Sequence, residues 1–119
     1  MAREELKLNQ VKVFNAPVEL EAPLFQNAAG NIAIKVEHKE CEKMVIVFKN
    51  DSPSGQTATI KAGDSFMSNH KDLYVAVKNS GIAAVTVESG RFKQMQGEYK
   101  GHVIIDIEGE LGVLAIELP

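Results

Sequence analysis

The chain has 119 residues, a length that suits one domain with one hydrophobic core and is too short for two. Its 45% hydrophobic and 24% charged residues are ordinary for a globular protein and exclude a largely disordered chain. The 16 acidic and 13 basic residues are interspersed and give a formal charge of -3. No basic face for a phosphate backbone is indicated, so nucleic acid is not expected as a partner.

The chain contains one cysteine, Cys41, which cannot form an internal disulfide. Nothing near the N-terminus has the apolar core of a signal peptide or of a membrane span, so a membrane is not expected as a partner. Both observations favour folding in a reducing cytoplasm. A protein that leaves the cell later, inside a particle, would show the same pattern.

The first ten residues are expected to form a flexible arm, followed by a single β domain over residues 11–119. Their apolar content is too low to predict a helix or a strand, because only Leu6 and Leu8 interrupt the charged residues Arg3, Glu4, Glu5 and Lys7. A frayed terminus is the usual fate of such a segment. The functional alternative is a tether that becomes ordered on a partner.

The N-terminal third predicts three short strands. Val11–Phe14 forms the first, and Val18–Ala22, in which apolar residues alternate with glutamates, forms a second that ends at Pro23. The asparagines and the glycine of Gln26–Asn31 predict a turn. The alternation in Ile32–Val36 then predicts a half-buried strand.

The middle of the chain predicts three more strands. Met44–Phe48 is apolar without interruption and is expected to lie centrally, covered on both faces. The cluster Lys49–Gly55 has the composition of a turn, and strands at Thr57–Lys61 and Leu73–Lys78 follow.

The strand that begins at Ile82 is expected to stop at a turn at Gly90 and to be re-anchored in the core by Phe92. Two final strands are predicted from their apolar alternation. They are Val103–Ile107 and Val113–Leu118, joined by a hairpin loop at Glu108–Gly112.

Short strands separated by turn signals, without any long segment of helical period, predict an all-β fold. We expect an antiparallel β-sandwich of about eight short strands, either immunoglobulin-like or jelly-roll-like. The chain has no tryptophan and no cysteine pair, so it lacks the hallmarks of a true antibody domain.

His38 and Cys41 lie three residues apart among Glu37, Glu40 and Glu42, a pattern that resembles a metal site. A closed zinc site usually needs four ligands in two spaced pairs, and the second pair is missing here. A solvated polar link before a core strand explains the same residues.

Catalysis by Cys41 would need a base, and His70 or His102 could serve, but neither lies in a recognisable nucleophile motif. Asp51 and Asp64 could bind calcium, but they lack the alternating acidic spacing of a calcium loop. We therefore expect no enzymatic activity, no metal and no cofactor.

A sugar-binding surface would need exposed aromatic rings, and the chain has two tyrosines, five phenylalanines and no tryptophan. Tyr99, beside Lys93, Lys100 and His102, is the aromatic residue that we expect to be exposed. The competing interpretation is a tyrosine that caps the open end of the sandwich.

Five segments between Met44 and Pro119 carry a family resemblance, and they are Val45–Asn50, Thr57–Asp64, Asp72–Val77, Glu88–Lys93 and Ala115–Pro119. They resemble the small β-sandwich decoration proteins that attach to the outer face of tailed-bacteriophage capsids. The likeness is strongest at Ser89–Lys93. The N-terminal third matches no such pattern, so the resemblance does not indicate the mode of attachment.

The resemblance implies a non-enzymatic structural protein of the virion, made in the host cytoplasm, that binds the major capsid protein and stabilises the capsid surface. Its expected contact residues are Arg3, Lys7, Arg91, Lys93 and Tyr99, with Arg91 pairing to capsid carboxylates. A monomer and a homo-oligomer on the capsid are both compatible with the sequence. The alternative function is a glycan-binding or host-surface adhesion module, and a small hydrolase or metal protein using Cys41 and His38 is a further rival.

Overall fold

The computed structural model describes residues 3–6, 8–20, 25–36, 43–64 and 71–119, and it confirms the expected all-β class. The sheet has eight strands. In chain order the elements are β1 (Glu4–Leu6), β2 (Leu8–Gln10), β3 (Gln26–Lys35), β4 (Met44–Lys49), β5 (Gln56–Ile60), β6 (Leu73–Val77), β7 (Ile82–Val85), a single helical turn α1 (Ser89–Phe92) and β8 (His102–Glu117). Within the described ranges, no helix has the length and apolar character needed to span a bilayer.

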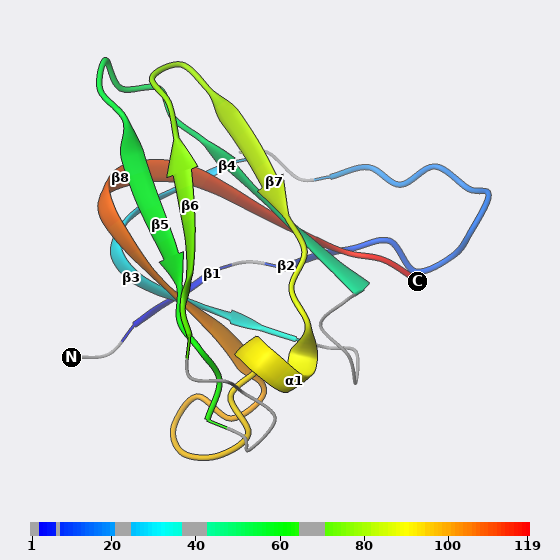
Figure 1. The fold of residues 1–119 in the computed structure, drawn as a ribbon. Coiled ribbons are helices and arrows are strands. Elements are labelled where there is room, and N and C mark those ends of the chain that lie inside the picture. Colours follow the sequence, from blue (N-terminus) through cyan, green and yellow to red (C-terminus); the bar gives the residue numbers. More distant parts are fainter. Residues whose placement is uncertain (1–2, 7, 21–24, 37–42, 65–70) are drawn as a thin grey trace.

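The long strand β8 organises the sheet. One of its edges pairs with β3 over most of its length, whereas the other edge pairs first with β5, over Ile105–Glu108, and then with β4, over Gly112–Glu117. β6 extends the sheet beyond β5, and β7 extends it beyond β4. Figure 1 shows β8 curving through the molecule, so that the sheet folds over on itself and encloses one core.

A β-bulge allows β8 to bend. The register between β3 and β8 shifts at Ala29 and Gly30, whose partners are Glu110 and Ile107, so two residues of β8 have no partner on β3. Gly30 and Gly109 both have positive φ, at 84° and 89°. Extra residues in one strand bend and twist a sheet, and glycine adopts positive φ without steric cost.

Two sequence predictions are wrong at this bulge. The segment Glu108–Gly112 is not a hairpin loop but part of a continuous strand, and Gln26–Asn31 is not a turn but the first half of β3. The physical reason is that glycine and asparagine suit a bulge as well as a turn. Which of the two forms depends on whether a partner strand is alongside.

The core draws its side chains from both halves of the folded sheet. Its largest fully buried members include Ile32, Ile34, Met44, Ile46, Phe48, Ile60, Val103 and Ile105. The predicted strand Met44–Phe48 lies inside the sheet, between β7 and β8. Its alternate residues Val45 and Val47 are only half-buried, so one face of this strand is fully covered rather than both.

The N-terminal segment differs from the expected arm. β1 pairs in parallel with β3, and β2 pairs in parallel with β8, so the sheet is mixed rather than purely antiparallel. Leu6 is buried in the core. Low apolar content did not prevent strand formation here, because the segment joins edges that the rest of the sheet provides.

The segment from Lys12 to Leu20, called here the projecting loop, contains no strand, although two were predicted in this region. Figure 1 shows it as a long blue excursion away from the sheet. Its apolar side chains Val13, Phe14 and Val18 are 60%, 74% and 48% exposed. A strand needs a partner edge, and this segment has none in the described part of the chain.

Candidate functional site

The segment Ser89–Phe92 folds as α1 and anchors one end of the domain. Phe92 is buried in the core, as predicted, and the side chain of Arg91 is 51% exposed. Phe92 therefore fixes the turn to the core, whereas Arg91 presents a cation to solvent.

A second resemblance segment lies directly against this turn. The N–H of Gly63 donates to the carbonyl oxygen of Arg91 at 2.6 Å. A Cβ atom at position 63 would lie 2.8 Å from the carbonyl oxygen of Lys93 and 3.0 Å from that of Arg91. Only glycine fits this approach without moving the backbone.

The chain that follows α1 is fixed by further polar contacts. Gln94 donates its side-chain amide to the carbonyl oxygen of Ala62 at 3.1 Å, and the N–H of Met95 donates to the Asp64 carboxylate at 2.6 Å. We call this region, residues 62–64 together with 91–101, the α1 end. Asp64, considered from sequence as a calcium ligand, is here an acceptor for the backbone.

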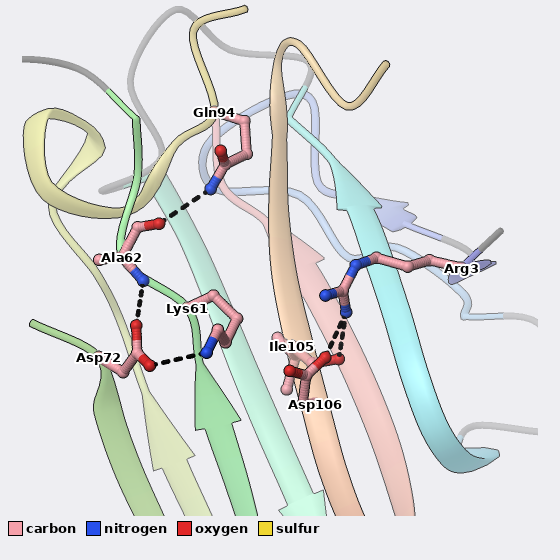
Figure 2. Close-up of polar contacts among 7 residues, drawn as sticks. All are labelled: Arg3, Lys61, Ala62, Asp72, Gln94, Ile105 and Asp106. Atoms are coloured by element: carbon pink, nitrogen blue, oxygen red, sulfur yellow. Dashed lines mark hydrogen bonds and ion pairs between the residues drawn. The ribbon is translucent and has the colours of Figure 1, made fainter. Parts of the chain in front are cut away.

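Asp72 ties the α1 end to β5. Its carboxylate accepts from Lys61 Nζ at 2.9 Å and from the N–H of Ala62 at 2.7 Å (Figure 2). The hydrogen bond from Lys61 and that from Ala62 lower the pKa of Asp72. The hydrogen bond to Asp72 and its negative charge raise the pKa of Lys61. Both groups are therefore charged over the neutral range and hold the strand end in place.

The Arg91 side chain forms a weak ion pair with Glu88. Its Nε lies 3.4 Å from Glu88 Oε2, and both side chains are largely in water. Exposed ion pairs of this kind contribute at most about 1 kcal/mol. A partner carboxylate could therefore replace Glu88 at little cost.

Arg3 and Tyr99, predicted separately as contact residues, lie together in an internal cluster. The backbone N–H of Arg3 donates to the Tyr99 hydroxyl at 2.6 Å. The Arg3 guanidinium binds the Asp106 carboxylate and the carbonyl oxygen of Ile105 (Figure 2). The expectation that these two side chains also contact a partner stays a prediction. Pairing of β1 with β3 places Arg3 over β8, where its Nη1 atom binds the Asp106 carboxylate and the carbonyl oxygen of Ile105.

A second contact closes the same cluster. His102 Nε2 lies 3.0 Å from Glu5 Oε1, and the ring of Tyr99 packs edge-on against the His102 ring with centroids 5.8 Å apart. Both the hydroxyl and the ring of Tyr99 therefore contact other residues of the chain. The cluster fastens β1 to the chain that precedes β8.

The remaining predicted residues are placed as follows. Lys93 is half-buried and forms an isolated bridge with Val103, and Asp51 is exposed near Lys49. Lys7 and the residues of the two rival sites, Glu37, His38, Glu40, Cys41, Glu42 and His70, lie outside the described residues. Among the residues that are described, no three His, Cys, Asp or Glu side chains converge as metal ligands would.

Sequence reasoning missed the residues that position α1. Gly63 and Asp64 were interpreted as turn residues, and no feature of the sequence indicated that Gln94 or Asp72 would bind across to Ala62. Gly63, Asp64 and Asp72 belong to the resemblance segments, whereas Gln94 lies one residue beyond one of them. Comparison of the chain with protein-family models, with curated proteins and with solved structures finds no match.

Proposed function

We propose that this protein is a non-enzymatic structural protein that binds the outer surface of an assembled phage capsid through its α1 end and stabilises the shell. One observation carries the proposal. The segment most similar to capsid decoration proteins, Ser89–Lys93, folds as an anchored turn that holds Arg91 in solvent. Its partner is the major capsid protein, and its location is the capsid surface of the virion.

The α1 end has the chemistry of a small protein-binding surface. Arg91 offers a planar fork of donors suited to a carboxylate. Met95, in the same region, is an exposed apolar side chain that adapts to irregular surfaces. Residues whose backbone is already fixed by hydrogen bonds lose little conformational entropy on binding. Even a modest contact stabilises the shell when it is repeated at every capsid site.

The test is co-sedimentation with expanded capsids that lack the protein, using immature procapsids for comparison. The wild-type chain should bind at a saturable, fixed ratio to the capsid protein. Arg91→Glu should weaken binding by at least about tenfold, because a repelled carboxylate replaces an attracted cation. Lys78→Glu is the matched control, since it reverses an exposed charge in the β6–β7 turn, at the opposite end of the domain from α1 (Figure 1).

Failure of the wild-type chain to bind either shell would overturn the proposal. Equal weakening by Arg91→Glu and Lys78→Glu would overturn the placement of the contact at the α1 end, because it would show a general effect of charge.

A glycan-binding module is the second candidate, and one observation favours it. Tyr74 on β6 is 70% exposed and lies opposite Thr59 of β5. An exposed aromatic ring beside a hydroxyl is a common arrangement for stacking a sugar. A glycan array that yields a ligand whose binding is lost in Tyr74→Ala and kept in Tyr99→Phe would favour this function over capsid binding.

A further inference from the structure

The folded sheet is open between β6 and β7. β6 pairs only with β5, and β7 pairs only with β4, among the strands that the structure describes. Figure 1 shows both strands leaving one turn and separating toward α1. We call the facing, unpaired edges of Leu73–Val77 and Ile82–Val85 the seam. Each strand presents one backbone edge toward a place where another strand would fit.

The floor of the seam is apolar. It is formed by half-buried side chains of both strands that pack against the core, namely Leu73, Val75, Ala83 and Val85. Neither bounding strand contains a charged residue or a proline. Natural sheet edges usually carry such residues to prevent pairing with other chains, so their lack marks an edge suited to accept a strand.

The projecting loop has the complementary character. Val18 and Leu20 alternate with Glu19, which is the pattern of a strand with one apolar and one polar face. This segment nevertheless pairs with no strand in the structure, and Val18 is largely exposed. The base of the loop is fixed, because the N–H of Val11 donates to the carbonyl oxygen of Glu117 at 2.8 Å.

We propose that the projecting loop of one copy inserts as an extended strand into the seam of a second copy. Val18 and Leu20 then face the apolar floor, Glu19 faces solvent, and the backbone of the loop pairs with the free edges of β6 and β7. Loop and seam are different surfaces, so each copy gives one strand and receives another. When the copy that receives the loop is not the copy that donates to the seam, contacts of this type generate rings or chains.

The test measures the oligomeric state of the purified full-length chain by sedimentation velocity over a range of concentrations. The wild-type chain should form species larger than a dimer as its concentration rises. Val18→Asp in the loop and Ala83→Asp in the seam should each weaken association by more than about a hundredfold, because each buries an unpaired carboxylate. Met95→Asp, at another exposed apolar side chain, is the matched control and should associate as wild type does.

A mixture of the two variants gives the sharpest result. Val18→Asp retains an intact seam and Ala83→Asp retains an intact loop, so the mixture should form one-to-one dimers and nothing larger. Should Ala83→Asp fail to fold, Val75→Thr replaces it, with association about tenfold weaker because a hydroxyl enters the floor.

A wild-type chain that stays monomeric into the millimolar range would overturn the inference. Variants that associate normally, or a mixture that forms no dimers, would also overturn it. The inference is independent of the proposed function, since Arg91→Glu should weaken capsid binding and leave self-association unchanged.

Discussion

Gly63 donates its backbone N–H to the carbonyl oxygen of Arg91 at 2.6 Å, and this contact joins two segments of the chain that are far apart in sequence. The end of β5 thereby becomes the support of α1. The orientation of Arg91 depends on this support. It also depends on the next residue, Phe92, whose side chain is buried in the core. Substitutions in the support should therefore affect stability and, under the proposed function, capsid binding.

Gly63→Ala should destabilise the domain by about 1 to 3 kcal/mol, because the new methyl group meets two backbone carbonyls that cannot rotate away. Urea unfolding measures the loss. Gly55→Ala is the control, since its Cβ would meet only the carbonyl oxygen of Val77, at an ordinary 3.8 Å. Equal stability of the two variants would show that α1 can shift without cost.

Asn50→Leu should destabilise the domain by about 2 to 4 kcal/mol, because it leaves buried carbonyl groups without a donor. The Asn50 side chain is fully buried, and its amide donates to the carbonyl oxygens of Ser54, Val77 and Lys78 at 2.8, 3.0 and 3.1 Å. Thermal unfolding compares it with Asn79→Leu at an exposed position, which should change stability by less than about 0.5 kcal/mol. A loss for Asn50→Leu as small as that control's would contradict the prediction.

The pair of Asp72 and Lys61 should give stability a defined pH dependence. Folding lowers the pKa of Asp72 below its usual value of 3.8, so its contribution is present above that pH and is lost as the pH falls through the lower, folded value. Folding raises the pKa of Lys61 above 10.5, so its contribution is present below that pH and is lost as the pH rises through the folded value.

Asp72→Asn should therefore cost at most about 1 kcal/mol at neutral pH, since the Lys61 side chain is 37% exposed and water screens the pair. The variant should also lose stability less steeply than wild type below pH 4. Urea unfolding between pH 2 and 7 measures both effects. Parallel pH profiles for the two proteins would show that this pair is not linked to folding.

Arg3→Ala should loosen β1 while leaving the rest of the sheet intact. The substitution removes the guanidinium that binds Asp106 and the carbonyl oxygen of Ile105. Hydrogen exchange of the backbone amides of Glu4–Leu6 should become faster, while that of β4 stays slow. Lys12→Ala, at an exposed position in the projecting loop, should leave both rates unchanged. Uniformly faster exchange across the domain would mean that Arg3 supports the whole fold rather than one strand.

Local pattern was sufficient for the strands whose two faces differ. The alternation in Thr57–Lys61 and Leu73–Lys78 places apolar side chains on one face at a period of two, whatever the partner strand is. The same holds for Phe92, whose large apolar ring after a glycine predicted an anchor in the core. These features follow from the residues themselves, because burying apolar surface is favourable in any compact arrangement.

Pairing was decided by the tertiary structure. Leu6 sits in a segment with little apolar content and is still buried, whereas Val13 and Val18 sit in segments with a strand pattern and stay exposed. The glycines of Glu108–Gly112 suit a hairpin or a bulge, and the strands beside β8 selected the bulge. A strand is stable only where another edge supplies its hydrogen bonds, and the position of that edge depends on residues far away in the sequence.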